Sequence, residues 1–247
     1  MYIETLEEIG LSQNEARIYE ALLAIGVATV PAIALKTGVH KRNIYDIVPK
    51  MLKKGIIYQI ADTRQNRYGP VSPTKLADLI WEKDEKLKKI LPDLSKQFRK
   101  TATNEAVYIY KGKEGFKNYL RDILAVGEDV FFVGAKGGWF DKDMHPFIED
   151  FLKQAKKRKI KYFHIFDAEV KKFAPDLLAE LGKPYRFLPE RYSTTGAIDI
   201  FGDHIVTFSG LTLKNITDDV TLVVIINNEL ADCYRTWFRF IWDHCGA

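Results

Sequence analysis

The sequence predicts an α+β N-terminal domain, a long linking helix and a larger α/β C-terminal domain. Apolar residues recur at helical spacing up to about residue 54, and two short strand-like runs follow them. A second helical pattern then continues to about residue 100. Beyond it, strand-like and helical segments alternate, which favours a sheet with covered faces. The predicted boundaries are 1–72, 73–101 and 102–247.

Composition allows two domains and points to the first of them for binding a polyanion. The chain has 247 residues, of which 47% are hydrophobic and 28% are charged, so a sizeable core can form. The formal net charge is only +4. Charge is unevenly distributed, however, since the segment 36–68 holds eight basic residues and two acidic ones. A polyanionic partner is therefore expected there.

The first domain reads as three main helices and a β-hairpin. Ser12 precedes Glu15 by three residues, which is a capping-box pattern for a helix that ends at Gly26. Further helices are predicted at 2–10, 30–36 and 40–54, the last with Pro49 bending it. Strand-like runs at 56–60 and 67–71 flank a polar turn. Three helices followed by a hairpin predict a winged helix-turn-helix.

In that architecture the second helix of the motif enters the DNA major groove with its N-terminal residues towards the bases. Arginine pairs with guanine and asparagine with adenine, whereas lysines suit phosphates. The hairpin tip would meet the DNA backbone or the minor groove. The residues predicted to contact double-stranded DNA are His40, Lys41, Arg42, Asn43, Tyr45 and Lys50 on the helix, and Arg64, Gln65, Asn66 and Arg67 at the tip. Lys53 and Lys54 are further candidates for phosphate contacts.

A long helix is predicted from Ser72-Pro73 to about residue 100, with a kink at Pro92. A narrow apolar stripe within a highly charged helix is typical of a coiled coil, so we interpret it as a dimerisation element. Packing of this helix on its own domain is the alternative. The stripe consists of Leu76, Ile80, Leu87, Ile90, Leu94 and Phe98.

The C-terminal domain is predicted to contain seven strands and four helices. The strands are expected at 106–110, 130–134, 160–166, 185–188, 197–201, 205–209 and 221–226, and the helices at 113–125, 144–157, 170–180 and 229–243.

Three segments of the first domain resemble the TrmB family of archaeal and bacterial transcription regulators. They are Leu6–Leu23, Ile33–Val48 and Leu52–Gly55, and the resemblance extends over residues 2–75. It includes the Thr-Gly turn at Thr37, the tyrosine at position 45 and the Lys-Gly before the wing. The resemblance implies a homodimer joined through a coiled-coil helix. Pro49 departs from the unbroken recognition helix of the family.

The same resemblance implies a phospholipase D-like C-terminal domain, and the segment 197–210 looks like the strand-turn-strand of that fold. An active repeat needs a histidine nucleophile, a lysine two residues later and an aspartate five residues after the lysine. Counting back from Asp199 or Asp203 puts other residues at the histidine and lysine positions, namely Tyr192 and Thr194 or Gly196 and Ile198. A phosphodiesterase is therefore the least favoured function, and the chain is not expected to be an enzyme.

An effector site is a further hypothesis for the C-terminal domain. The segment Val133–Phe140 is glycine-rich and follows a predicted strand, so a ligand can approach the backbone there. Lys136 could bind an anion and Trp139 could stack on a sugar or base. Asp199, Arg191 and Tyr192 are weaker candidates for the same cleft. The alternative interpretation is a strand-to-helix turn with a packed tryptophan.

No cofactor or metal site is expected. The spacing of His145, His164, His204 and His244 suits no metal, and each is interpreted as a surface or hydrogen-bonded histidine. Cys233 and Cys245 are expected to be free thiols. No apolar run approaches the ~20 residues of a membrane span, and no signal peptide is evident, so a cytoplasmic location is expected.

Two functions of the DNA-binding class remain open at this point. The first is a dimeric, sequence-specific transcription regulator whose C-terminal domain senses a small molecule. The second is an architectural protein that coats DNA with little regard to sequence.

Overall fold

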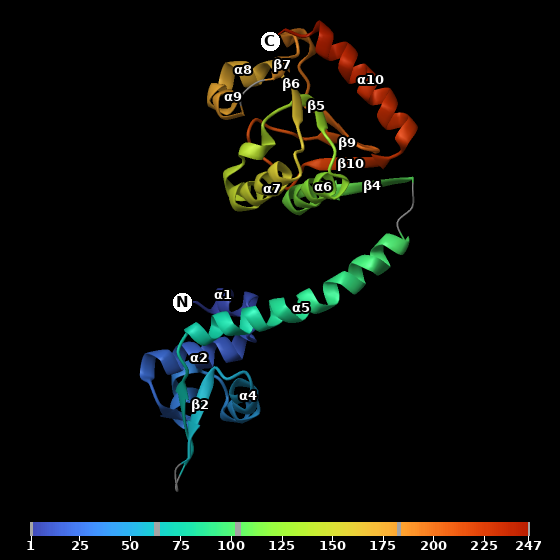
Figure 1. The fold of residues 1–247 in the computed structure, drawn as a ribbon. Helices are drawn as coiled ribbons and strands as arrows, with labels where there is room; N and C mark the ends of the chain where they lie inside the picture. Colours follow the sequence, from blue (N-terminus) through green and yellow to red (C-terminus); the bar gives the residue numbers. More distant parts are fainter. Residues whose placement is uncertain (1, 62–64, 102–104, 182–183, 247) are drawn as a thin grey trace. The chain divides into compact units, whose positions relative to one another are not determined.

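The computed structural model describes residues 2–61, 65–101, 105–181 and 184–246. The chain divides into two compact units, Met1–Ala102 and Thr103–Ala247, called unit 1 and unit 2 below. Each unit contains both helices and strands (Figure 1).

Unit 1 begins with four helices and a small sheet. The helices are α1 (Ile3–Glu8), α2 (Gln13–Ile25), α3 (Val30–Thr37) and α4 (Lys41–Lys53). The strands are β1 (Ala28–Thr29), β2 (Ile57–Ile60) and β3 (Arg67–Pro70), paired antiparallel in the order β1-β3-β2. The helices and the β2–β3 hairpin follow the predicted order. The two-residue strand β1 was not predicted.

Local signals in the sequence explain where these helices begin and end. The Ser12 hydroxyl accepts the amide of Glu15, whose carboxylate accepts the amide of Ser12, so the capping box has formed at the start of α2. Gly38 ends α3 with a φ of 72°, a conformation that favours glycine, and so makes the tight turn into α4. Helix α4 is continuous through Pro49.

The core of unit 1 lies between α2, α3, α4 and the sheet. Its fully buried members include Tyr19, Ile33, Ile44 and Met51. The hydroxyl of Tyr19 donates to the carbonyl of Val71, 2.9 Å away, and so anchors the chain that leaves the hairpin. The apolar face of α4 is thereby packed in the core, and its polar face is exposed.

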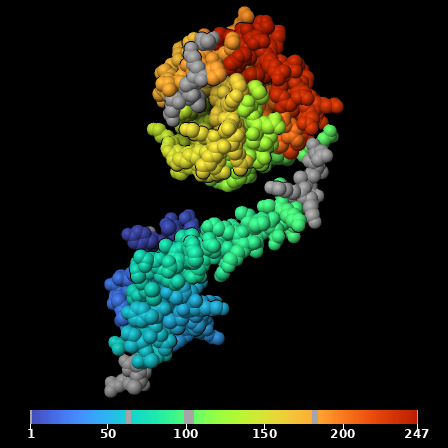
Figure 2. All heavy atoms as spheres, in the orientation of Figure 1, coloured from blue at the N-terminus to red at the C-terminus, as the bar shows by residue number. Residues whose placement is uncertain are grey.

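Helix α5 (Thr74–Thr101) is longer than the other helices of unit 1 and runs through Pro92. It begins at Thr74, two residues after the predicted start. Leu76 and Leu79 pack on the core of unit 1. The apolar residues further along are exposed, and Figure 2 shows this part of α5 clear of the other elements of unit 1. The first part of the helix therefore packs on its own unit, as far as Lys83, whose ammonium donates to the carbonyl of Ile9 at 2.7 Å.

Unit 2 is built on a seven-stranded mixed sheet with the order β4-β10-β9-β8-β5-β6-β7. Only β5, β6 and β7 run parallel to one another, and the other neighbours are antiparallel. The strands are β4 (Ala106–Lys111), β5 (Val130–Ala135), β6 (Tyr162–Phe166), β7 (Tyr185–Phe187), β8 (Ala197–Phe201), β9 (His204–Ser209) and β10 (Thr221–Ile226). All seven predicted strands are present, with small shifts at their ends.

Helices cover both faces of this sheet (Figure 1). Helices α6 (Gly112–Val126) and α7 (His145–Lys157) cover one face, and α10 (Asn228–His244) packs on the other. Helices α8 (Ala168–Phe173) and α9 (Pro175–Leu181) pack beside β6 and β7. The prediction of one helix over 170–180 was wrong, because Pro175 disfavours a helical conformation at Ala174 and begins a new helix.

Two further observations concern the thiols of unit 2 and the helices of both units. Cys233 and Cys245 are free thiols, as expected. None of the described helices is long and apolar enough to cross a membrane.

Candidate nucleic-acid interface and ligand cavity

One face of α4 is buried, and the opposite face carries the polar residues predicted to meet DNA. Ile44, Val48 and Met51 point into the core. Tyr45 is 56% exposed, which leaves a large aromatic ring in contact with solvent on the polar face. The other exposed members of this face are His40, Lys41, Arg42, Asn43, Asp46, Lys50 and Lys53. We call this set the open face of α4.

The N-terminus of α4 is suited to an anion. His40 is the N-cap, and its ring nitrogen Nδ1 accepts the backbone amide of Arg42 at 3.3 Å. The first turn has no acidic residue, so the partial positive charge of the helix terminus is not offset there. Asp46, one turn on, is the single acidic residue of the open face and was not considered among the predicted contacts.

The hairpin tip is described only in part. Gln65, Asn66 and Arg67 are exposed and follow one another into β3. Arg64 lies outside the described residues, so its predicted contact stays a prediction.

Lys54 does not belong to the open face. Its ammonium lies 2.6 Å from the Glu15 carboxylate and 3.2 Å from the carbonyl of Gly10, so it ties the C-terminal end of α4 to the start of α2. Burial alone would raise the pKa of Glu15, but hydrogen bonds from Lys54 and Ser12 and the charge of Lys54 together lower it. The predicted phosphate contact of Lys54 therefore competes with an ion pair that the sequence does not show.

Lys50 lies beside a groove as well as on the open face of α4. Together with Lys53 it borders a groove lined by Gly10, Ser12 and Lys75. Lys50 therefore lies at the edge of the open face and not at its centre.

Unit 2 contains a cavity on the sheet face that α6 covers. Its floor is a row of three side chains in register, Asp199 on β8, Phe132 on β5 and His164 on β6. The cavity has a volume of about 50 Å³, which is room for a few water molecules or one small ligand. The cavity is lined by Phe116, Phe132, Ala135, Lys136, Gly137, Gly138, Trp139, Phe140, His164, Phe166, Ala197, Asp199, Phe208, Leu211 and Ile216.

The three residues proposed for an effector, Lys136, Trp139 and Asp199, all line this cavity. Arg191 and Tyr192 do not line it. They are exposed, and the guanidinium of Arg191 lies over the Tyr192 ring, 4.8 Å from its centre. Of the three weaker candidates, Asp199 therefore lines the cavity and the other two do not.

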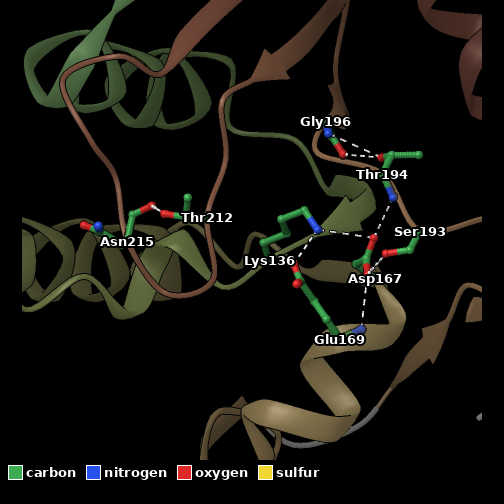
Figure 3. A network of polar contacts seen from close by, with 8 residues as sticks. All are labelled: Lys136, Asp167, Glu169, Ser193, Thr194, Gly196, Thr212 and Asn215. Carbon is green, nitrogen blue, oxygen red and sulfur yellow. Dashed lines mark hydrogen bonds and ion pairs between the residues drawn. The ribbon is translucent and has the colours of Figure 1, made fainter.

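Lys136 is buried and already paired with two carboxylates. Its ammonium lies 3.3 Å from Asp167 and also contacts Glu169 (Figure 3). Asp167 in turn accepts the Ser193 hydroxyl at 2.6 Å and the amides of Thr194 and Glu169 at 3.0 and 3.1 Å. The predicted anion contact of Lys136 therefore competes with a pair that is built into the fold.

The carboxyl of Asp199 is buried and accepts the Tyr119 hydroxyl at 2.6 Å. Burial raises the pKa of Asp199 to about 8, and the Tyr119 hydrogen bond only partly opposes that rise. Asp199 is accordingly protonated and uncharged at neutral pH.

His164 was predicted to be a surface or hydrogen-bonded histidine, and this was wrong. Its side chain is buried between two aromatic rings, and within the described parts of the chain its ring nitrogens have no hydrogen-bond partner. Burial lowers the pKa of His164 to about 3, so the ring is neutral. Alternation of Tyr162, His164 and Phe166 along β6 is the sequence signal that could have placed it on the cavity face.

The other histidines have polar neighbours, as predicted. His204 contacts Asp203, His244 contacts the carbonyl of Phe240, and His145 lies 3.6 Å from Glu149. Among the described residues, no group of three or more histidine, cysteine or carboxylate side chains is arranged to hold a metal ion.

Comparison with known proteins defines the class of unit 1. Residues 6–74 match the family model described as the sugar-specific transcriptional regulator TrmB. The matched part of unit 1, which holds its helices and hairpin, is therefore similar to the TrmB family of transcription regulators. The resemblance of the first 75 residues to this family is confirmed over the matched range.

Two solved structures resemble the chain more distantly. One is of TrmBL2, an archaeal chromatin protein, with 21% identity, a TM-score of 0.48, and coverage of 99% of this chain and 98% of the other. Another is the antimony-specific transcriptional repressor AntR, with 18% identity, a TM-score of 0.26, and coverage of 38% and 80%. Both TM-scores lie below 0.5, so these likenesses settle neither fold nor function. None of the curated proteins compared matches the chain.

Proposed function

We propose that this protein is a dimeric, sequence-specific transcription regulator that reads DNA with the open face of α4. The observation that carries the proposal is the burial pattern of α4, where the predicted contact residues other than Lys54 are exposed and Ile44, Val48 and Met51 are in the core. Arg42 and Asn43 at the start of the helix have the chemistry to read guanine and adenine edges. Lys41, Lys50 and Lys53 suit phosphates.

The wing supports the same proposal. Gln65, Asn66 and Arg67 are exposed beside the hairpin and have donors suited to the DNA backbone or minor groove. In this proposal they hold the register while α4 reads the sequence.

Footprinting on genomic fragments at physiological salt tests the proposal. A short protected site with two related half-sites is expected, because a dimer presents two reading helices. Continuous protection regardless of sequence would instead support the architectural alternative and overturn the regulator.

Arg42→Ala is the sharpest variant for the reading helix. We expect it to weaken binding to the specific site by about 1–3 kcal/mol and to relax the preference at one base position. Arg17→Ala, at an exposed arginine on α2, is the matched control and should bind normally. Unchanged affinity of Arg42→Ala at matched salt would contradict this placement of the helix.

We further propose that α5 forms the dimer contact. Ile80, Leu87 and Leu94 follow one another at seven-residue spacing, and each is about half exposed. Leu87→Asp is expected to convert dimers to monomers in sedimentation equilibrium, whereas Lys89→Asp on the far side of the helix should not. A monomeric unmodified protein would refute the dimer.

Unit 2 is proposed to be the sensing part of the regulator, since it encloses the cavity beside Trp139. Its descent from a phospholipase D-like domain stays a prediction, supported by the strand-turn-strand of β8 and β9. A cytoplasmic location likewise stays a prediction.

A further inference from the structure

His164 is a polar side chain of the unit 2 cavity that has no hydrogen-bond partner among the described residues. The imidazole of His164 is only 8% exposed, and it stacks on Phe132 with ring centres 4.4 Å apart and planes 4° apart. Phe166 lies on its other side, with ring centres 5.0 Å apart. The Tyr162 hydroxyl is fully enclosed without a partner, whereas the His164 nitrogens are accessible at the cavity surface, where a group from outside the chain can satisfy them.

The remaining polar groups of the cavity carry no free charge at neutral pH. Lys136 is neutralised by Asp167 and Glu169. Asp199 is protonated and bound to Tyr119 through one carboxyl oxygen. A charged ligand would lose its hydration here without gaining a counter-charge, and the Lys136 ammonium would also oppose a cation.

The walls of the cavity favour a flat apolar ligand. Trp139 meets the Phe132 ring edge to face with centres 5.3 Å apart, and it lies 6.0 Å from His164 in a similar orientation. Phe116 and Phe208 line the cavity near Asp199, and Leu211 and Ile216 come from the loop before β10. Aromatic walls at these angles accept a further ring in stacked or edge-to-face contact.

The loop that carries Leu211 and Ile216 is fastened at two points. The Asp141 carboxylate accepts the amide of Ile216 at 2.7 Å, and the amide of Lys214 donates to the carbonyl of Lys136 at 3.0 Å. The loop is thereby held in place, and the cavity offers few of the free hydrogen-bonding groups that the hydroxyls of a sugar need.

We propose that this cavity binds a small uncharged aromatic molecule with one hydroxyl or N–H group, which hydrogen-bonds to His164 while its ring packs against Trp139 and Phe132. This ligand class rests on the proposed role of unit 2 as the sensing part. It differs from the sugars named in the description of the matched family.

Four probes on the full-length protein at pH 7 test the proposal. Benzyl alcohol, benzoate and benzylammonium share one ring and differ in charge, and glucose represents a sugar. Dissociation constants are measured by NMR titration or calorimetry. We expect benzyl alcohol to bind at least tenfold more tightly than each of the others. Tightest binding of benzylammonium, benzoate or glucose, or no binding of any probe, would overturn the proposal.

Substitution of His164 separates a ligand contact from a structural residue. His164→Phe is expected to reduce affinity for benzyl alcohol at least tenfold without lowering the melting temperature, because the ring stays stacked and the unpartnered nitrogens are removed. Ala197→Leu should also reduce binding by filling the cavity, and Ala125→Leu, at an exposed site on α6, should not. Undiminished binding by His164→Phe would refute the contact, and if that variant does not fold, Ala197→Leu and the four probes still decide.

The two proposals can fail separately. Specific DNA affinity is measured with and without saturating benzyl alcohol. Binding of the probe with unchanged DNA affinity would leave the ligand class standing and remove the sensing role. If no probe binds and the footprints are normal, the proposal of an aromatic ligand is refuted and the proposal of a DNA-binding regulator stands.

Discussion

Lys50 on α4 and Lys136 in unit 2 are singled out by the sequence for the same reason, a positive charge at a place where a ligand can approach. Their surroundings are opposite. Lys50 is exposed at the edge of the open face. Lys136 is 5% exposed and lies against Asp167 and Glu169. A lysine thus has the same appearance in a sequence whether its counter-ion is a partner molecule or the protein itself.

The comparison extends to the polar groups around each site. On α4 the solvent hydrates the side chains until DNA replaces it, so charge costs little in the free protein. In the cavity, Asp199 and His164 are both uncharged at neutral pH because burial disfavours their charged forms. Unit 1 is therefore suited to a polyanion, and unit 2 to an uncharged molecule.

Removing the buried ammonium of Lys136 should lower the free energy of unfolding more than any other change predicted here. Lys136→Met leaves Asp167 buried without its ion pair, and loss of one partner of a buried pair costs about 3–5 kcal/mol. The free energy of unfolding is measured in urea by tryptophan fluorescence. Lys153→Met, which removes an exposed lysine 3.7 Å from Glu149, is the control and should change stability by less than about 0.5 kcal/mol.

A loss below about 1 kcal/mol in Lys136→Met would break the comparison. Lys136 would then be free to exchange its carboxylates for an anionic ligand, as the sequence alone suggests.

The ionisation of Asp199 gives the next largest effect, and it depends on pH. The folded chain has a pKa of about 8 at Asp199, against 3.8 for the ordinary carboxyl, so between these values the folded state holds the extra proton. Stability therefore falls as pH rises through this range, by up to about 1.4 kcal/mol per pH unit. Because the side chain at this position in Asp199→Asn cannot ionise, the stability of the variant does not show this decrease with pH.

The measurement is the difference in unfolding free energy between the unmodified protein and Asp199→Asn at pH 6 and pH 8. Between pH 6 and pH 8, we expect the free energy of unfolding of the variant to rise by about 2 kcal/mol relative to that of the unmodified protein. His164 contributes equally to both proteins and cancels in the difference. Parallel profiles would show that Asp199 is ionised at neutral pH, and the cavity would then suit a cation.

The sequence predicts α4 well because its signals are local. Ile44, Val48 and Met51 recur at helical spacing, and His40 and Gly38 mark its start. The two-residue strand β1 could not be predicted in this way, since it exists only through pairing with Arg67 and Tyr68, about forty residues later.

The cavity depends on long-range pairing to a greater degree. The register of β8, β5 and β6 brings Asp199, Phe132 and His164 into one row, although Asp199 comes 35 positions after His164 in the sequence. The counter-ion of Lys136 comes from residue 167 for the same reason. The sequence could therefore name three of the lining residues but not the charge state of the site.

The smallest predicted effect separates two adjacent lysines at the end of α4. Lys54→Met should lower stability by about 1–2 kcal/mol, because the buried Glu15 carboxylate loses a partner whose own side chain is a third exposed. Its DNA affinity should keep the same salt dependence. Lys53→Met should do the reverse, with stability unchanged and the slope of log affinity against log salt reduced by about 1.

Urea unfolding and DNA titrations at several salt concentrations, carried out on both variants, check this pair. The two residues are neighbours in the chain with the same charge, so a general effect of losing one positive charge near DNA would appear equally in both. A reduced salt slope in Lys54→Met would mean that the ion pair with Glu15 opens when DNA binds. The boundary between the open face of α4 and the interior of unit 1 would then lie one residue further along the helix.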